Sequence, residues 1–466
     1  MSCHSNSTPL TIGSLIKWGS AESEASEAMR RRKVKTVWND SRQVASGDVF
    51  VALRTENDDG HRYVQSAFQN GANAAIVDRK GIELIPEKYR KKCIIVTNTL
   101  KAVQKMAARY RNEMGILVVG ITGSNGKTTT RSFVSTVLKQ AIKVGETFSN
   151  WNNHIGVPLS LLRFDGDEWA GVIEMGANHI GEIHPLSKIA APDISVITNI
   201  GYAHVGLFGS LKGTTQAKFE IADGLSKDGF MLLNGDDPRL VKEARRRDLR
   251  TVFFGTTPKC DFRAENIQVS TEGVSFDIED QEYVLGVSGR HFVYSVLPAI
   301  YIARRCGIPE DLIQKTLVSL SPVSLRGMLK EKMGIRFIVD CYNANPSSMS
   351  SAIRYLADIT PVRKQRVAII GDMLELEKYT RKLHLKLGEE LVKSDVRKII
   401  AVGEFASHIT QGAVNAGLSS RNVFEAVDSE QALQIARDVL KAGETVLLKG
   451  SRGIRLEKVF EGFENE

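Results

Sequence analysis

The stretch between residues 118 and 130 most constrains this chain, because it reads as an apolar strand, a glycine-rich loop and the start of a helix. In that order, the backbone N–H groups of the loop and the N-terminus of the helix form a binding site for phosphate. Lys127 adds a positive charge for the β- and γ-phosphates, and Thr128 adds a hydroxyl for Mg²⁺. The alternative, an ordinary strand–turn–helix with a solvated lysine, leaves the order Gly, Asn, Gly, Lys, Thr unexplained. We therefore predict that the chain binds a nucleotide.

The loop departs from the strict phosphate-loop pattern G-x-x-x-x-G-K-[ST], because Ile121 stands at the first glycine position. Two later glycines still supply the turn that the backbone needs. No Asn-Lys-x-Asp sequence occurs in the chain, which argues against a GTPase. The predicted nucleotide-binding residues of the loop are Gly123, Ser124, Asn125, Gly126, Lys127, Thr128 and Thr129.

Composition bounds the class of protein. A length of 466 residues fits three domains of ordinary size better than one. With 42% hydrophobic and 25% charged residues, the chain has the composition of a soluble globular protein. It has neither an apolar run of the roughly 18 residues that span a membrane nor a signal-peptide stretch at its start. Its five cysteines are scattered, so neither a disulfide framework nor a zinc site is indicated. We expect a cytoplasmic protein without stable membrane insertion.

The net charge of +8 comes from 62 basic and 54 acidic residues, with basic clusters at residues 30–35 and 245–250. Nucleic-acid binding is one interpretation, but neither cluster carries interleaved aromatic residues or a recognisable nucleic-acid motif. A solvated surface with a general attraction for anionic substrates explains the clusters better. We therefore predict no nucleic-acid partner.

Apolar segments alternate with helical patterns in the first half of the chain. Residues 97–114 are expected to form a helix that leads into the phosphate loop, because their apolar positions share one face. Strands are expected at residues 48–53, 171–173, 194–200 and 230–233. This alternation predicts a mostly parallel sheet with the phosphate loop at its carboxyl edge.

Residues 250–288 differ, because their β-rich pattern alternates in the way that is typical of an antiparallel insert. A helix over residues 291–305 is expected to close that domain. After about Pro322, a second α/β series has expected strands at 337–339, 367–370, 399–402 and 446–448. We predict an α/β protein of three domains: a small N-terminal α/β domain (1–98), a central phosphate-loop ATPase domain with a mostly parallel sheet (99–322), and a Rossmann-like C-terminal domain (323–466).

Two polar residues follow apolar strands downstream of the phosphate loop. Glu174 ends the strand around residues 171–173, which would place a carboxylate at the sheet edge, where Mg²⁺ beside phosphate needs oxygen ligands. His204 follows another strand end. From the residues alone, Glu174 could equally face water, and a lone histidine is more often structural than a ligand.

Further motifs run nearly from end to end in one collinear order. The first part carries Asp40-Ser41-Arg42, Gly47 to Leu53 and Asp59-Gly60-His61. The centre carries Gly123 to Thr130, Asn150 to Leu159, Glu174 to His179, Asn199 to His204 and Phe208-Gly209-Ser210. The end carries Asp340 to Pro346, Gly371 to Leu376 and Lys449 to Gly453. With these motifs the chain resembles the Mur ligase family, the ATP-dependent amide-bond-forming enzymes of peptidoglycan synthesis. Its Tyr-Asn-Ala-Asn-Pro and Gly-Asp-Met-Leu-Glu-Leu stretches most resemble the ligases that join D-alanyl-D-alanine to UDP-N-acetylmuramoyl-tripeptide.

The resemblance implies a UDP-sugar-binding domain, an ATPase domain, and a C-terminal domain that closes and brings the dipeptide. It implies that Lys127 holds the γ-phosphate, that Thr128 and Glu174 hold one Mg²⁺, and that His204 helps bind a second. Lys218 matches the lysine that the family carbamylates, which would turn a cation into a carboxylate-like ligand for a hard metal.

By the same resemblance, Arg326 reaches the nucleotide phosphates and Asp340 contacts the ribose. The expected catalytic residues are Lys127, His204, Lys218 and Arg326. The expected substrate-binding residues are Asp40, Ser41, Arg42, Asn152, Asn153, Asn343 and Asn345.

The chain departs from the family pattern where adenine is expected. Family members usually place asparagines at the two positions that Phe292 and Ser295 occupy here. Asparagine can form two hydrogen bonds with the N6/N7 edge of adenine, and phenylalanine cannot. Adenine would then be selected less strictly, or its ring would be held by stacking. A smaller departure is Leu376-Glu377, where a glycine is often seen.

The implied reaction begins with attack of the tripeptide carboxylate on the γ-phosphate of ATP, which gives an acyl phosphate and ADP. The amine of D-alanyl-D-alanine then attacks the acyl carbon and phosphate leaves. A monomer is expected. Two alternatives stay open: another ligase of the same superfamily, such as a different Mur step or a folylpolyglutamate synthase, and a catalytically weakened homologue that only binds UDP-muramyl ligands.

Overall fold

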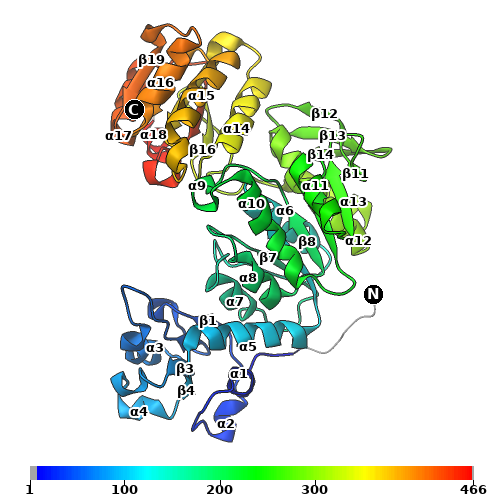
Figure 1. Cartoon of the computed structure of the whole chain (residues 1–466), viewed down its shortest axis with the longest axis vertical. Helices are drawn as coiled ribbons and strands as arrows, with labels where there is room; N and C mark the ends of the chain where they lie inside the picture. The colour runs from blue at the N-terminus through cyan, green and yellow to red at the C-terminus, as the bar shows by residue number, and fades with distance from the viewer. Residues whose placement is uncertain (1–7, 464–466) are drawn as a thin grey trace.

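Three larger β-sheets, each of four or more strands, follow one another along the chain and lie one above the next in the computed structural model, which describes residues 8–463 (Figure 1). The sheet formed by the first strands of the chain (β1 to β4) lies at the bottom of the view, the central sheet in the middle and the C-terminal sheet at the top. All three carry helices, so the α/β class and the three-part arrangement predicted from the sequence are confirmed. No helix within residues 8–463 is long and apolar enough to cross a membrane.

The first body is a four-stranded parallel sheet in the order β1-β2-β3-β4. Its short strands are rich in Val, Ile and Ala that are fully buried, as expected for a parallel sheet covered on its faces. The strands are β1 (Val37–Trp38), β2 (Val49–Val51), β3 (Ala74–Asp78) and β4 (Cys93–Val96). The helices are α1 (Ile12–Gly19), α2 (Glu27–Arg30), α3 (Val64–Gln69) and α4 (Glu87–Arg90), with short 3-10 turns at η1 (Ser41–Gln43), η2 (Gly60–Tyr63) and η3 (Ile82–Leu84).

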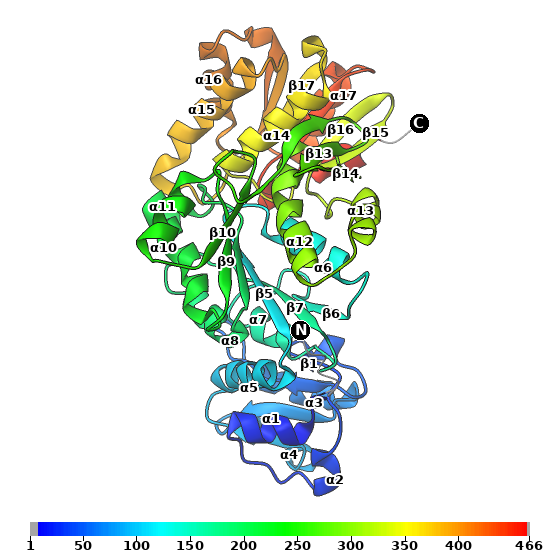
Figure 2. The ribbon, with the colours of Figure 1, turned by 90° about the vertical axis from the view of Figure 1, so that its right-hand side faces the viewer.

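Helix α5 (Thr99–Met114) joins the first body to the second. It begins at an Asn98 cap whose side chain accepts from the Lys101 N–H, and it ends at Gly115 in the left-handed conformation. One continuous apolar core runs from the first sheet, through the buried face of α5, to the central sheet. In Figures 1 and 2, α5 accordingly lies as a rod between the two bodies.

The central body is a seven-stranded sheet in the order β11-β10-β9-β8-β5-β7-β6, and neighbouring strands are parallel throughout. Its strands are β5 (Leu117–Thr122), β6 (Val144–Glu146), β7 (Ala170–Glu174), β8 (Ile194–Ile197), β9 (Phe230–Asn234), β10 (Thr251–Gly255) and β11 (Phe262–Arg263). After β7 the chain crosses β5 to form β8 on its other side, so the strand order reverses at β5. In open parallel sheets ligands bind at such a reversal, outside the carboxyl ends of the strands.

The helices around this sheet are α6 (Lys127–Leu138), α7 (Gly156–Leu161), α8 (Ile183–Ala190), α9 (Val205–Phe208), α10 (Leu211–Phe219) and α11 (Pro238–Arg246), with the turn η4 (Glu220–Gly224). Then come the turn η5 (Arg290–Phe292), α12 (Val293–Arg305), which packs closely on α6, and α13 (Glu310–Ser319). The expected helix at 291–305 therefore starts two residues later, after a 3-10 turn.

The expectation of an antiparallel insert over residues 250–288 is only partly right. Strands β10 and β11 extend the parallel central sheet, because β10 pairs with β9 from Thr251 to Phe254. Only β12 (Glu265–Val269), β13 (Val274–Ile278) and β14 (Gln281–Leu285) form an antiparallel sheet. The alternating burial pattern occurs in β13 and does not extend back to β10.

The C-terminal body is a six-stranded sheet in the order β15-β16-β20-β17-β18-β19, parallel except for the edge strand β15. Its strands are β15 (Met328–Lys332), β16 (Ile335–Asp340), β17 (Arg366–Gly371), β18 (Lys398–Val402), β19 (Val423–Ala426) and β20 (Thr445–Lys449). Its helices are α14 (Pro346–Ile359), α15 (Thr380–Lys393), α16 (Ala406–Asn415), α17 (Ser429–Val439) and α18 (Glu457–Glu461), with turns at η6 (Arg363–Gln365), η7 (Glu377–Tyr379), η8 (Ser420–Asn422) and η9 (Arg452–Ile454).

Candidate active site

The phosphate loop lies between β5 and α6, at the reversal point of the central sheet. Its Gly123 has φ 145° and Gly126 has φ 79°, backbone conformations that favour glycine. A Cβ at Gly123 would lie only 2.0 Å from the Thr198 hydroxyl, so the loop also needs glycine there for space. Thr198 in turn donates to the backbone oxygen of Asn125 at 2.6 Å. These contacts fix the conformation of the loop that leads into the first turn of α6.

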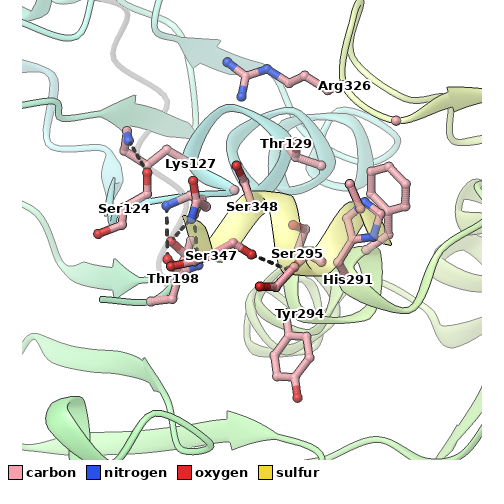
Figure 3. A pocket seen from close by; sticks show the side chains of 18 of the residues that line it. Ser124, Lys127, Thr129, Thr198, His291, Tyr294, Ser295, Arg326, Ser347 and Ser348 are labelled. Carbon is pink, nitrogen blue, oxygen red and sulfur yellow. Dashed lines mark hydrogen bonds between the residues drawn. The ribbon is translucent and has the colours of Figure 1, made fainter. Parts of the chain in front are cut away.

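Lys127 folds back over the loop, where its Nζ donates to the carbonyl oxygens of Gly123 at 2.8 Å and Ser124 at 3.4 Å (Figure 3). Burial lowers the pKa of Lys127 below its ordinary value, and the negative charge of Glu174 opposes that shift. An anion bound at the loop would accept hydrogen bonds from the Nζ in place of these carbonyl oxygens and would favour the charged form of the lysine. The Nζ of Lys127 is therefore close enough to the loop to contact a phosphate bound there.

Glu174 ends β7, as the sequence predicts, and is 2% exposed. Its Oε1 accepts from the Asn152 amide at 2.8 Å. Its Oε2 is buried without a hydrogen bond, and the nearest cation is Arg131, whose Nε lies 3.6 Å away. A buried carboxylate oxygen left without a donor is costly, and a hard cation would satisfy it. The residues therefore fit a Mg²⁺ ion beside the phosphate loop.

His204 lies in the turn before α9, and Lys218 lies on α10. Burial lowers the pKa of His204, while the carboxylate of Glu375 acts in the opposite direction. Burial, together with the positive charge of Lys127, lowers the pKa of Lys218 to about 7. Lys218 is 2% exposed and its Nζ lies 5.2 Å from the centre of the Phe208 ring, so it is not the surface lysine that its sequence context alone would suggest.

Arg326 reaches the phosphate loop from the segment that leads into the C-terminal body (Figure 3). Its Nη2 donates to the Thr128 hydroxyl at 3.2 Å, and its guanidinium lies 3.9 Å from the centre of the Tyr342 ring. Its Nε is buried without a hydrogen bond. Stacking thus holds the guanidinium beside the loop while one donor is left for a ligand oxygen.

The Tyr-Asn-Ala-Asn-Pro stretch contacts the phosphate loop directly. Asn345 and Asn125 exchange two amide hydrogen bonds of 3.2 Å and 2.6 Å. The Oδ1 of Asn345 also caps α14 by accepting from the Ser348 N–H. Asn345 is 4% exposed, so its amide joins two bodies of the protein and leaves little for a substrate.

The predicted residues divide into those that line one cavity and those that do not. The cavity has a volume of about 680 Å³ and lies between the central and C-terminal bodies. Its predicted lining residues are Ser124, Asn125, Gly126, Lys127, Thr128, Thr129, Asn152, Glu174, His204, Arg326, Asp340 and Asn343. Gly123, Lys218 and Asn345 are not among the residues that line the cavity. Asn153 caps α7 through the N–H groups of Ile155 and Gly156.

Asp40, Ser41 and Arg42 lie apart from the cavity, in the first body. Asp40 accepts from the Arg42 guanidinium at 2.9 Å and 2.8 Å, and this bonding lowers the pKa of Asp40 to about 2. Arg42 is otherwise exposed to solvent. Ser41 is buried, so within this group the Arg42 side chain is the one most open to solvent.

Other lining residues were not predicted. Asp236 accepts hydrogen bonds from Thr256, Thr257 and Tyr294, which draws the start of α12 toward the end of β9. Lys449 donates to Asp340 at 2.7 Å and ties the ends of β20 and β16 together. Lys449 is the last residue of β20 and Asp236 lies two residues after β9, so their closeness to a strand end was a signal that the sequence offered for both.

The fold, the phosphate loop, the buried carboxylate and the bridging arginine define a class, that of phosphate-loop nucleotide-binding proteins with a further α/β body closing on the site. Family models match three ranges of the chain: the Mur ligase catalytic domain over residues 33–111, the middle domain over 121–303, and the glutamate ligase domain over 326–452. The chain therefore belongs to the Mur ligase family.

Individual relatives agree. The chain is 34% identical over 426 residues to the UDP-N-acetylmuramoyl-tripeptide–D-alanyl-D-alanine ligase of Bacillus subtilis, covering 91% of this chain and 92% of the relative. For the ligase of the same name from Escherichia coli, the identity is 31% over 430 residues, with 91% and 92% covered. Among solved structures, MurF from Acinetobacter baumannii superposes with a TM-score of 0.86 at 28% identity, covering 98% of this chain and 99% of that one. MurF from Thermotoga maritima in complex with ADP gives 0.80 at 29% identity, with 92% and 97% covered.

Proposed function

We propose that this chain is the ATP-dependent ligase that joins D-alanyl-D-alanine to UDP-N-acetylmuramoyl-tripeptide and so makes the UDP-muramyl-pentapeptide precursor of peptidoglycan. The observation that carries the proposal is the match, over 91% of the chain, to relatives named for that reaction. It is supported by a cavity that gathers the phosphate loop, a buried carboxylate and an arginine between two bodies.

ATP binds with its phosphates on the loop between β5 and α6. The tripeptide carboxylate attacks the γ-phosphorus, the bond from that phosphorus to the β,γ-bridging oxygen breaks, and ADP leaves with that oxygen. Lys127 and Arg326 offset the negative charge that develops on the transferred group. Activation is needed because a carboxylate is a poor acyl donor.

The residues present fit two Mg²⁺ ions, because the Oε2 of Glu174 is a buried oxygen without a hydrogen bond and the His204 imidazole lines the same cavity. Thr128 and Glu174 would hold one ion. His204 and a carbamylated Lys218 would hold the other, and a pKa near 7 leaves a fraction of Lys218 neutral and able to react with CO₂. When bound, the ions neutralise phosphate oxygens as charge builds up.

The amine of D-alanyl-D-alanine then attacks the acyl carbon, the C–O bond to phosphate breaks, and the amine loses its extra proton. Water would hydrolyse the acyl phosphate, so the site must be closed during this step. Contacts such as the Asn125–Asn345 pair and the Arg326–Thr128 bond bring the C-terminal body over the loop.

We further propose the domain boundaries 1–98, 99–322 and 323–466, with each described sheet inside one range. We propose that the protein acts as a monomer without a nucleic-acid partner. A cytoplasmic location would give it access to ATP. The tripeptide-linked sugar would span the first and central bodies, where Asp40, Ser41, Arg42, Asn152 and Asn153 are the proposed contacts.

The proposed function is tested by measuring phosphate release with ATP and Mg²⁺. The two substrates to be joined, UDP-muramyl-tripeptide and D-alanyl-D-alanine, are omitted in turn. We expect release only when UDP-muramyl-tripeptide and D-alanyl-D-alanine are both present, together with a product of the pentapeptide mass. Turnover with a different UDP-muramyl peptide and amino acid would point to another Mur step. Binding of the UDP-peptide without any phosphate release would favour a binding module instead.

Base selection gives a separate prediction. Phe292 and Ser295 both line the cavity. The Phe292 ring packs against Phe133 and offers no hydrogen bond to a base, whereas position 295 carries a polar side chain. We expect Ser295→Asn to raise the ratio of ATP to GTP turnover by about tenfold, since a bidentate amide discriminates bases by about 1–3 kcal/mol. The ratio of kcat/KM for the two nucleotides measures it. An unchanged ratio would show that this position does not face the base.

A further inference from the structure

The turn that carries His204 is also the place where the C-terminal body packs on the central body. Val205, the first residue of α9, is 1% exposed and belongs to an apolar cluster made mainly of C-terminal residues such as Met373 and Leu376. The backbone N–H of Gly206 donates to the carbonyl oxygen of Glu375 at 3.3 Å. The metal-site turn is therefore held by the loop after β17, which carries the Gly-Asp-Met-Leu-Glu-Leu motif.

The turn that carries His204 and the loop after β17 approach each other closely at Gly206. A Cβ on Gly206 would lie 2.3 Å from the Cγ of Glu377 and 2.9 Å from the carbonyl oxygen of Glu375. Farther along the same loop, the Tyr379 hydroxyl donates to the Gly209 carbonyl at 3.4 Å. Polar and apolar contacts on both sides of Gly206 thus fix the position of the loop relative to α9.

Both partners of the contact hold unusual backbone conformations. His204 has φ 54° and Glu375 has φ 61°, in the left-handed region that non-glycine residues rarely adopt. Such a conformation is unfavourable for a residue other than glycine, and it persists only where the surrounding structure enforces it. These two backbone conformations bring the side chains of His204 and Glu375 together.

The carboxylate of Glu375 lies 2.5 Å from the Nδ1 of His204. The contact has the distance of an ion pair, and the Nδ1 of His204 has no formed hydrogen bond. The Glu375 side chain is 49% exposed, so a rotation about its own bonds can align it. The imidazole itself is more buried, with 24% of its side chain exposed.

We propose that Glu375 is the positioning residue for His204. Its carboxylate accepts a hydrogen bond from the Nδ1–H of His204, which fixes the tautomer and leaves the lone pair of Nε2 for a metal ion. Metal-binding histidines commonly donate their other ring N–H to a carboxylate in this way, and that partner orients the ring. The proposal rests on the metal-binding role of His204 given under the proposed function.

Since Glu375 and His204 belong to different bodies, the metal site is complete only when the C-terminal body is docked. The ion therefore binds a docked molecule more tightly than an undocked one, and by the same free energy the ion favours docking. Metal affinity then reports on the position of the C-terminal body.

The test is Mn²⁺ binding to the full chain with saturating ADP, followed by electron paramagnetic resonance in the absence of both amide substrates. His204→Ala identifies the Mn²⁺ signal that belongs to this site. At that signal we expect Glu375→Ala to weaken Mn²⁺ about tenfold or more, the loss typical for such a partner. Glu375→Gln should lie between Glu375→Ala and wild type, because an amide oxygen still accepts a hydrogen bond. Glu377→Gln is the matched control on the same loop and should stay near wild type.

A second readout is the ring tautomer of His204, followed by ¹⁵N chemical shifts. We expect the Nδ1–H form in the wild-type protein and a mixture of tautomers in Glu375→Ala. Wild-type Mn²⁺ affinity together with an unchanged tautomer in Glu375→Ala would overturn the proposal. None of these measurements needs turnover, so their outcome is independent of whether the two amide substrates prove to be the right ones.

Discussion

Replacing Lys127 by alanine should lower kcat for substrate-dependent phosphate release by about 10³-fold, the size of effect seen when one preorganised donor to a developing charge is removed. The lysine already lies on the phosphate loop, with its Nζ 2.8 Å from the Gly123 carbonyl. The charge on the transferred phosphoryl group changes most in the transition state, so we expect the loss in kcat more than in KM for ATP. Initial rates over a range of ATP concentrations separate the two.

Lys139→Ala is the matched control, because Lys139 lies at the other end of α6, is 44% exposed and pairs with Glu146. It should keep wild-type kinetics. A Lys127→Ala protein that turns over at near the wild-type rate would show that the lysine does not act on the γ-phosphate, and the proposed mechanism would then be wrong.

Replacing Lys218 by methionine should have two opposite effects. Turnover should fall by about 10²-fold or more, because the proposed metal ligand is lost. The free energy of unfolding should rise by about 3 kcal/mol, because a buried ammonium is replaced by an apolar side chain of similar length. Urea unfolding in bicarbonate-free buffer measures the gain. Gain of stability with loss of activity is the pattern expected for a functional group held in an unfavourable place.

The sign of the pH dependence follows from the lowered pKa. Lys218 has a pKa of about 7 in the folded state against an ordinary 10.5, so between those values the unfolded chain binds more protons. Wild-type stability therefore rises with pH across that window, and the advantage of Lys218→Met is largest below pH 7 and shrinks toward pH 10.5. Lys212→Met, an exposed change on the same helix, should alter neither activity nor stability. A Lys218→Met protein less stable than wild type at pH 6 would contradict the burial argument.

Local sequence signals predicted the parts of the site that depend on short stretches of chain. The phosphate loop and Glu174 both follow apolar strands, and a parallel sheet brings such strand ends to one edge, so their proximity could be inferred from order alone. The role of Lys218 could not be inferred in this way, since its burial depends on how α10 packs against α9 and the central sheet. Only the family resemblance indicated it.

The contacts between the central and C-terminal bodies could not be predicted from the sequence. Asn345 is expected from the resemblance to bind substrate, yet its amide caps α14 and pairs with Asn125, which lies 220 positions earlier in the chain. The contact of Glu375 with His204 likewise depends on left-handed turns in two separate bodies. The strands β10 and β11 illustrate the same limit, because their neighbours in the sheet decide their direction and their own pattern does not.

The apolar core shared through α5 has a mechanical consequence. Since the first sheet, α5 and the central sheet are packed as one, the molecule should move as two rigid parts, with the C-terminal body as the mobile one. The span from the Asp40 region to Glu174 is then a fixed length, whatever the C-terminal body does. The proposed substrate contacts at the two ends of that span would then stay a constant distance apart, which would restrict the length of the peptide that can reach the phosphate loop.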